Sequence, residues 1–274
     1  MVFALGVESA VHAALSVARR IGLRADSARP ISLVGRAVFL IEPCLVVAKV
    51  SPLVDKLRCE TEIALATHVV CQEGPVVSPL LRGEPGPYVF ADAAVTLWEH
   101  CPLEADARTP GHAAGTAYSQ LVPHLQSYGG VLPDFRVPIR DCGRAVEHDG
   151  LGRLSGGALD LLRNEFEGLE QLDLPQKEMR NLHGDPHLGN LTLSEGRALW
   201  LDLKAACTGP PEWDLTALPA SAGLDPRRPD LFKQLQRLRS ACVVVWCARK
   251  EKPAPMELEA IRIHLERLAG QCAV

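Results

Sequence analysis

The hydrophobic periodicity of this chain changes near residue 99, and that change constrains the fold more than any other feature. Before it, apolar runs rich in β-branched residues, Ile31–Ile41 and Cys44–Val50, predict two strands, and the turn Glu42-Pro43 between them predicts a hairpin. Two more strands are predicted at Tyr88–Phe90 and Val95–Trp98. The sequence therefore predicts an α+β fold of two lobes, with a small antiparallel β-sheet in the first lobe.

Helical spacing of apolar residues dominates the remainder of the chain. The predicted helices are His112–Leu125, Leu154–Leu172, Leu231–Arg249 and Met256–Leu268. One compact strand-turn-strand unit, Leu191–Leu193 and Ala198–Leu203, interrupts them. We therefore expect an N-terminal lobe at 1–98 and a larger, mainly helical C-terminal lobe at 99–274, with a ligand site in the cleft between them.

Two helices are predicted within the first lobe. The segment from Met1 to Ala18 has apolar residues at helical spacing but no basic stretch before them, so it predicts an amphipathic helix rather than a signal peptide. Its buried face is expected to carry Val7, Val11, Leu15 and Ala18. A second pattern, which includes Leu57, Ile63, Ala64, Val69 and Val70, predicts the one key helix of this lobe.

Composition excludes several classes of function. With 274 residues, a net charge of −4 and no block of five like charges, the chain has no sign of a nucleic-acid surface. Nine cysteines without a CxxC pair suggest reduced thiols, as in a cytoplasmic protein. The longest later apolar stretch, Ala241–Ala248, is far shorter than the ~20 residues of a membrane span. We expect neither nucleic acid nor membrane as a partner.

The stretch Leu182–Leu215 carries the clearest chemical signal. A carboxylate and an amide, Asp185 and Asn190, stand at the two ends of a tight loop that contains glycine and proline, and Asp202 ends the strand-turn-strand unit that follows. Mg²⁺ prefers oxygen ligands, which Asn190 and Asp202 can supply. Asp185 can accept the proton of an acceptor hydroxyl, and His183 can hold the loop by hydrogen bonds.

This stretch resembles the catalytic loop of aminoglycoside phosphotransferases and related small-molecule kinases. His183-Gly184-Asp185 and Asn190 match the pattern H-G-D-x-x-x-x-N, and Gly209–Leu215 is similar to the G-P-x-x-x-D-L-A segment of that family. The resemblance implies a protein-kinase-like two-lobe fold, with an N-terminal nucleotide-binding lobe at 1–98 and a C-terminal catalytic and substrate-binding lobe at 99–274. It also implies ATP and Mg²⁺ as cofactors, and Asp214 as an anchor of the loop.

Two matches lie upstream of this loop. Lys49, in Val46–Lys49, is similar to the family's phosphate-binding lysine, and Glu62 resembles the helix glutamate that pairs with it. Glu60 is the alternative, but the apolar residues that follow Glu62 favour Glu62. The segment 95–100 looks like the family's hinge, where the backbone around Glu99 and Cys101 would bind adenine.

Two features depart from the family pattern. Only Gly35 stands where a glycine-rich loop is expected, and the neighbouring Arg36 either reaches a phosphate or is solvated. Lys204 occupies a position that is commonly acidic. On a strand it would face the same side as Asp202, where it either neutralises that carboxylate or contacts phosphate.

The predicted function is an ATP-dependent phosphotransferase that moves the γ-phosphoryl group to a hydroxyl of a small molecule, with an aminoglycoside or other antibiotic as the preferred substrate. A metabolic kinase for choline, homoserine, a sugar or a similar amino alcohol is one alternative. A nucleotide-binding pseudokinase, suggested by Lys204 and the sparse glycine loop, is another.

Overall fold

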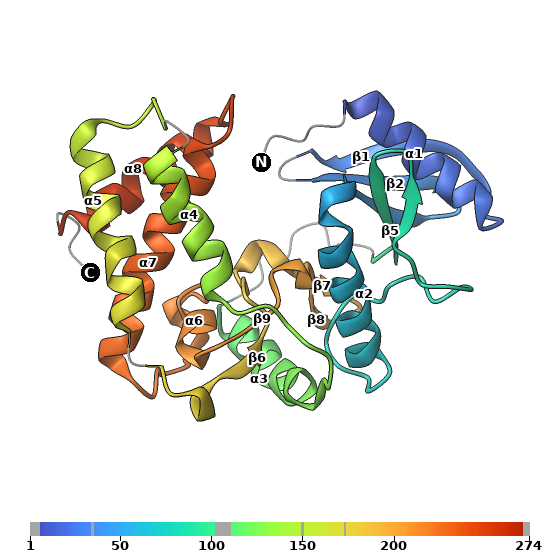
Figure 1. Ribbon diagram of the computed structural model, residues 1–274. Coiled ribbons are helices and arrows are strands. Elements are labelled where there is room, and N and C mark those ends of the chain that lie inside the picture. The colour runs from blue at the N-terminus through green and yellow to red at the C-terminus, as the bar shows by residue number, and fades with distance from the viewer. Residues whose placement is uncertain (1–5, 34–35, 102–110, 149–150, 173, 271–274) are drawn as a thin grey trace.

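The computed structural model describes residues 6–33, 36–101, 111–148, 151–172 and 174–270, and its two lobes lie side by side (Figure 1). The first lobe contains a five-stranded antiparallel sheet of order β1-β2-β3-β5-β4. Its strands are β1 (Ala25–Ser32), β2 (Ala37–Pro43), β3 (Val46–Pro52), β4 (Tyr88–Phe90) and β5 (Ala93–Glu99). The predicted hairpin is present as β2 and β3, with Phe39 opposite Ala48, but its turn lies at Cys44-Leu45 and not at Glu42-Pro43. Residues 31–32 of the predicted first strand belong to β1.

Two helices cover opposite faces of this sheet. Residues alternate between the faces of a strand, so Ala48 on β3 packs against helix α1 (Val7–Arg20), while its neighbour Val47 packs against the core that contains helix α2 (Lys56–Val70). Lys49 therefore shares the α2 face with Val47. This places the lysine and the key helix on the same side of the sheet.

The buried face of α1 matches the predicted one in part. Ala18 is fully buried and Val11 and Leu15 are partly buried against the same core, whereas Val7 is exposed. The most buried residues are Ala10, Ala13, Ala14, Val17 and Ala18, because small alanine side chains allow the helix backbone to approach the sheet closely.

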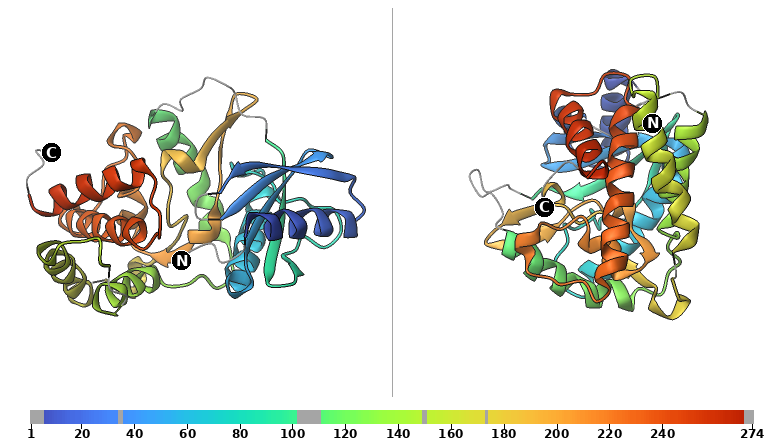
Figure 2. Two further views of the ribbon diagram at one scale, coloured as in Figure 1. Left: turned by 90° about the horizontal axis from the view of Figure 1, so that it is seen from above. Right: turned by 90° about the vertical axis from the view of Figure 1, so that its left-hand side faces the viewer.

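The second lobe is mainly helical and is most easily seen from the side (Figure 2). Its helices are α3 (Gly111–Ser127), α4 (Arg136–His148), α5 (Gly156–Glu167), α6 (Pro211–Leu215), α7 (Pro229–Ala248) and α8 (Pro255–Leu268). Helices α4, α5, α7 and α8 enclose one apolar core, in which Ile139, Leu162, Leu235 and Cys242 are fully buried. The predicted α+β two-lobe fold is confirmed.

Three details of this lobe were not predicted correctly. Helix α4 was missed because its sequence contains Pro138 and Gly143, which lower the helical signal. The predicted helix Leu154–Leu172 is α5 followed by a 3₁₀ turn, Gly168–Gln171. The second strand of the predicted strand-turn-strand unit ends at Trp200 instead of Leu203.

Short antiparallel strand pairs support the loops between these helices. Strand β6 (Arg180–Leu182) pairs with β9 (Cys207–Gly209), and β7 (Leu191–Ser194) pairs with β8 (Arg197–Trp200). The loop between β6 and β7 carries His183, Asp185 and Asn190. A core shared by α2, α3 and the β7–β8 hairpin, with Trp200 almost fully buried, joins this loop region to the first lobe.

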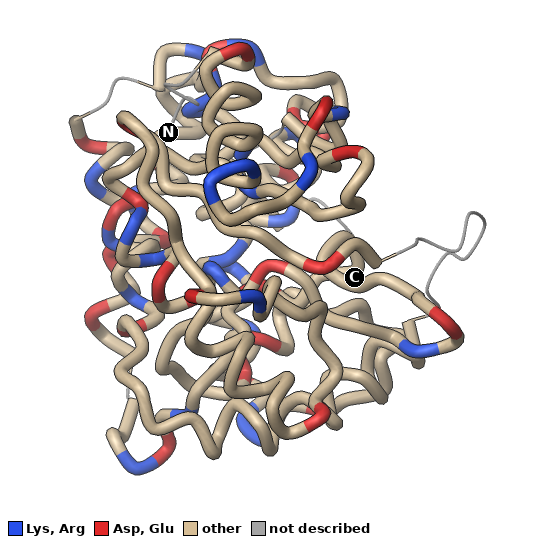
Figure 3. Tube along the Cα trace, turned by 90° about the vertical axis from the view of Figure 1, so that its right-hand side faces the viewer, with Lys and Arg blue, Asp and Glu red and all other residues tan. Residues whose placement is uncertain are grey.

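Basic and acidic residues are interspersed over both lobes on the side seen in Figure 3. In the described part of the chain, no helix combines the length and the apolar character needed to cross a membrane.

Candidate active site

The loop that follows β6 has a backbone shape that only glycine permits at its second residue. Gly184 has φ = 87°, and a Cβ atom there would lie 1.8 Å from the carbonyl oxygen of Ala205. Any other side chain would push the loop away from the segment after Asp202. The glycine between His183 and Asp185 thus brings the loop and that segment into direct contact.

Asp214 anchors the backbone of this loop through hydrogen bonds. This fully buried carboxylate accepts hydrogen bonds from the backbone N–H groups of His183 and Gly184, each at 2.8 Å, and from the hydroxyl of Tyr118 at 2.9 Å. Burial raises the pKa of Asp214 above its ordinary value, and His183, Tyr118 and Arg239 lower it only in part. Its geometry fits the role of loop anchor that the resemblance implied.

His183 is completely buried and holds the loop through both ring nitrogens. Nε2 lies 3.1 Å from the carbonyl oxygen of Leu201, and Nδ1 accepts the N–H of Asp185 at 3.3 Å. Burial lowers the pKa of His183, which favours the neutral ring that these two bonds require. These contacts of a fully buried ring fit the part expected of His183 from the sequence, which is to hold the catalytic loop by hydrogen bonds.

The Asp185 side chain is one-third exposed, so one end of it can meet a ligand. Its Oδ1 accepts a hydrogen bond from Nη1 of Arg239 at 3.1 Å, and Nε2 of His187 lies 3.5 Å from Oδ2. Arg239 is itself fixed, because it also donates to the carbonyl oxygens of Gly184 and Trp213 and lies 3.9 Å above the Trp213 ring. The ionised carboxylate is thus held in one orientation.

A chain of short contacts connects Asp185, Asn190 and the strand end before Asp202. The Asn190 amide nitrogen donates to the carbonyl oxygen of Asp185 at 2.9 Å, and the carbonyl oxygen of Asn190 accepts the N–H of Leu201 at 2.8 Å. Asp202, the next residue, has the left-handed backbone conformation φ = 57°, ψ = 59°, which aspartate tolerates better than most residues. The loop and the β8 end therefore form one connected unit.

On the first lobe, Lys49 and Glu62 form an ion pair. Nζ of Lys49 lies 2.9 Å from Oε1 of Glu62 and 3.9 Å above the centre of the Trp98 ring. Glu62 is fully buried, whereas Glu60 pairs with Lys56 on the helix surface. The structure therefore puts Glu62, and not the alternative Glu60, beside the lysine.

Arg36 is the second cation, after Lys49, that forms an ion pair with Glu62. Its Nη1 donates to Oε2 of Glu62 at 2.8 Å, and its Nη2 forms an ion pair with Oδ1 of Asp202 in the other lobe. Burial by itself would raise the pKa of Glu62, but Arg36 and Lys49 lower it to about 2. Burial likewise opposes the charge of Arg36, but the two carboxylates raise its pKa above the ordinary value.

Lys204 does not face Asp202. Its Nζ lies 2.8 Å from Oδ2 of Asp55, the residue that precedes α2. The expectation that the two residues share a strand face was wrong, because residues 203–205 form a 3₁₀ turn, and alternation of side chains does not apply there. Lys204 instead links the segment after Asp202 to the first lobe.

The hinge region is described only as far as Cys101, and residues 102–110 lie outside the described part. The backbone N–H of Glu99 donates to the carbonyl oxygen of Ser78 at 2.9 Å, so this donor is already used. The expectation that the backbone around Glu99 and Cys101 binds adenine stays a prediction.

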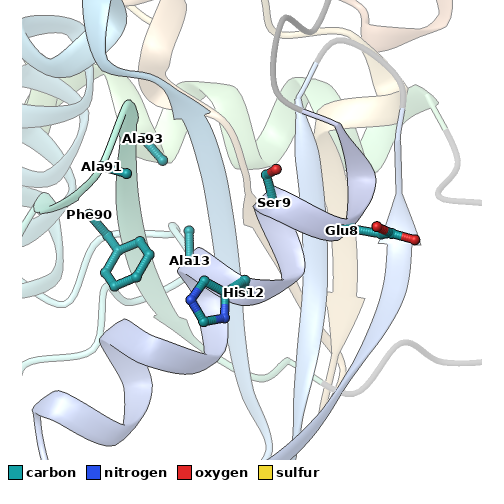
Figure 4. A pocket seen from close by; sticks show the side chains of 7 residues that line it. All are labelled: Glu8, Ser9, His12, Ala13, Phe90, Ala91 and Ala93. Atoms are coloured by element: carbon teal, nitrogen blue, oxygen red, sulfur yellow. The ribbon is translucent and has the colours of Figure 1, made fainter.

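A hollow of about 370 Å³ lies elsewhere, between α1 and the β4–β5 turn (Figure 4). Figure 4 labels its lining side chains, which are Glu8, Ser9, His12, Ala13, Phe90, Ala91 and Ala93. The His12 and Phe90 rings meet edge to face at 5.2 Å. This hollow is on the α1 face of the sheet, opposite to Lys49, and is separate from the candidate site.

The oxygen donors at the site fit a metal ion that arrives with phosphate. Because the amide nitrogen of Asn190 is turned toward Asp185, its Oδ1 is the end available to a cation, and 40% of the Asp202 side chain is exposed. Within the described residues, no three His, Cys, Asp or Glu side chains gather as a metal site. Two protein oxygens with phosphate oxygens and water match the coordination of Mg²⁺ on a nucleotide.

Sequence reasoning missed Arg239 as a functional residue and left Arg36 undecided. Arg239 had a recognisable signal, since it falls on the buried face of α7 together with Leu235, Leu238 and Cys242. A charged residue on a buried helix face needs a partner. Arg36 had no such signal, because both of its partners are distant in the sequence.

Comparison with known structures supports the same architecture. The amicoumacin kinase hAmiN, in complex with AMP-PNP, Ca²⁺ and Ami, has a TM-score of 0.67 at 12% identity over 89% of this chain and 88% of that chain. The GDP and kanamycin complex of APH(2")-IIia gives 0.64 at 13% identity, over 95% of this chain and 97% of the other.

A choline/ethanolamine kinase family protein from Mesorhizobium loti gives a TM-score of 0.62 at 16% identity, over 96% of this chain and 93% of that chain. At these identities the likeness concerns the fold. Comparison with curated protein sequences gives no match. The profile of the phosphotransferase enzyme family matches residues 36–246, from just before β2 into α7. The chain therefore belongs to the phosphotransferase enzyme family.

Proposed function

We propose that this protein transfers the γ-phosphoryl group of ATP to a hydroxyl of a small molecule, with Asp185 as the group that accepts the hydroxyl proton. The observation that carries the proposal is that the Asp185 side chain is both accessible to a ligand and fixed in its orientation. Its carboxylate is partly exposed, yet it is held in one orientation by the buried Arg239 and lies on the same loop as Asn190.

In the proposed reaction the acceptor oxygen forms a bond to the γ-phosphorus as the bond from that phosphorus to the β–γ bridging oxygen breaks. Asp185 orients the hydroxyl and takes its proton, and ADP leaves with the bridging oxygen. Lys49, fixed by Glu62, binds α- and β-phosphate oxygens. Asn190 and Asp202 would hold Mg²⁺, which supplies positive charge to neutralise the phosphates.

Adenine would bind near the hinge at Cys101, where the described chain leaves the first lobe. Positioning and charge neutralisation are expected to supply most of the rate acceleration. His183, Asp214 and Arg239 contribute by holding Asp185 in place.

For the acceptor we propose an antibiotic, with aminoglycosides tested first. The fold similarity to the amicoumacin kinase and to the kanamycin-bound phosphotransferase supports this choice. A choline-type amino alcohol is the second candidate, and the similarity to the choline/ethanolamine kinase family protein supports it. A pseudokinase is the third, and the ion pair between Arg36 and Asp202, a proposed metal ligand, supports it.

The test is a phosphate-transfer screen with γ-labelled ATP and Mg²⁺ over aminoglycosides, other hydroxyl-bearing antibiotics, sugars and amino alcohols. Asp185→Asn serves as the blank, and Asp230→Asn, at a carboxylate that is 97% exposed, serves as the matched control. Labelled product with the wild type and the control but not with the blank supports the proposal. ATP binding without transfer to any acceptor would favour the pseudokinase.

A further inference from the structure

Arg36 connects the two lobes at the point where the proposed phosphate site and metal site meet. It lies just before β2, and its side chain is only 9% exposed. One side of the guanidinium binds Glu62 on α2, and the other binds Asp202 after β8. A guanidinium carries five N–H donors in a fixed plane, so it suits carboxylate and phosphate oxygens equally well.

The charges in this cluster balance. Lys49 and Arg36 are positive, and Glu62 and Asp202 are negative. Glu62 uses one carboxylate oxygen for each cation and is fully buried, so it cannot leave. Asp202 is different, because 40% of its side chain is exposed. It is therefore the member of the cluster that can change its partner.

A change of partner at Asp202 would leave Arg36 with buried donors that need another oxygen. The triphosphate bound by Lys49 would supply such oxygens, because Lys49 and Arg36 share the Glu62 carboxylate. Asp202, once released, would be free for the metal ion. The exchange conserves the pairing of every charge in the cluster.

We propose that Arg36 is a second phosphate-binding cation beside Lys49, and that Asp202 and the nucleotide phosphates compete for it. This inference rests on the proposed function. In the empty site Arg36 neutralises Asp202. When nucleotide and metal bind, Arg36 moves its hydrogen bonds to phosphate oxygens and Asp202 turns to the cation.

The Lys204–Asp55 ion pair makes such an exchange possible without separation of the lobes. It lies two residues from Asp202 and is mostly buried, with 19% and 11% of the two side chains exposed. Because this pair does not include either partner in the exchange, it keeps the segment 202–204 against α2 while the Asp202 side chain changes partner.

Calorimetric titration of the full chain with ATP, in EDTA and in excess Mg²⁺, tests the proposal without any acceptor. Arg36→Gln should weaken the binding of metal-free ATP about tenfold or more, the loss expected for a charge-assisted hydrogen bond. Arg36→Lys should recover part of this loss. Arg29→Gln is the matched control, since it removes the same charge from an exposed position on β1.

Competition is tested by Asp202→Asn. It should strengthen the binding of metal-free ATP, because Arg36 no longer has Asp202 as a partner. Removal of a negative charge could do the same by simple electrostatics, so the double variant Arg36→Gln with Asp202→Asn decides between the two. If Arg36 carries the effect, the gain from Asp202→Asn disappears in the Arg36→Gln background.

Metal-free ATP binding that is the same in Arg36→Gln as in the wild type would overturn the proposal. So would a gain from Asp202→Asn that persists in full in the double variant. If Arg36→Gln does not fold, as judged by circular dichroism, Arg36→Lys and Asp202→Asn provide the same comparison. A wild type that binds no ATP under either condition would instead refute the proposed function, and the inference with it.

Discussion

The two halves of the candidate site are stabilised by different kinds of interaction. In the second lobe, the backbone of the loop is fixed by hydrogen bonds to Asp214, to Asn190 and to the neighbouring segment, and Arg239 orients the Asp185 side chain. In the first lobe, Lys49 and Arg36 are held by a single buried carboxylate, Glu62. The catalytic half is thus a loop that is held mainly through its backbone, whereas the phosphate-binding half is held by ion pairs between charged side chains.

The two halves of the site should therefore respond differently to ligand binding and to mutation. Backbone hydrogen bonds fix a geometry that depends little on the ligand. Ion pairs can exchange partners, which suits a site where a highly charged ligand must enter and leave. We therefore expect changes in the second lobe to affect chemistry and folding, and changes in the first lobe to affect nucleotide binding and acid sensitivity.

The largest effect is expected from Asp185→Asn. Loss of the proton acceptor should lower the transfer rate about 10²–10⁴-fold, the usual contribution of a general base. The melting temperature should change little, because Asp185 is partly exposed. Initial rates with an acceptor from the screen provide the measurement. A variant that keeps more than a tenth of the wild-type rate would show that this loop does not supply the proton acceptor of the reaction.

Asp214→Asn should reduce stability by roughly 2–4 kcal/mol, because an amide cannot accept all three of the buried hydrogen bonds. Urea unfolding followed by fluorescence gives the value. Tyr118→Phe removes only one of the donors and should cost about 1 kcal/mol. Equal losses in the two variants would argue against Asp214 as the anchor of the loop.

Glu62 should make the first lobe sensitive to acid. Its pKa is about 2, against an ordinary 4.5, so its contribution to stability is complete above about pH 4.5 and is lost as the pH falls through about 2. The pKa difference corresponds to about 3 kcal/mol. Unfolding free energies of the wild type and Glu62→Gln should therefore converge in this range.

His183 affects stability in a separate pH range, so its contribution can be distinguished from that of Glu62. Its pKa is lowered by burial, so the stability associated with the neutral ring is complete above pH 6.5 and declines as the pH falls below that value.

Glu60→Gln is the control for Glu62, because Glu60 is a surface residue paired with Lys56. A convergence that also occurs with Glu60→Gln would contradict the assignment to Glu62.

A small effect on stability is expected at Lys204. Lys204→Met and Asp55→Asn should each reduce stability by about 1–2 kcal/mol, and a double-mutant cycle should show that the two losses are coupled. Neither should alter the Mg²⁺ dependence of ATP binding, in contrast to Arg36→Gln. A changed Mg²⁺ dependence in Lys204→Met would restore the earlier expectation that Lys204 acts on Asp202.

The sequence by itself determined the fold class and the part of the site that is local in the chain. Period-two and helical patterns located most strands and helices, since each depends on neighbouring residues. The residues from His183 to Asp214 lie within one segment, so their spacing was visible in the sequence. Helix α4 escaped because its proline and glycine obscure the periodicity, although packing against α5 and α7 stabilises it.

Only the tertiary structure decided which charged residues are partners. Arg36 pairs with Asp202 across 166 residues, Lys204 with Asp55 across 149 and Arg239 with Asp185 across 54. The left-handed conformation of Asp202 and the 3₁₀ turn after it also reversed the expected direction of Lys204. Ion pairs act through space and leave no periodic trace in a sequence, so the balance of charges between the lobes becomes visible only when the chain is folded.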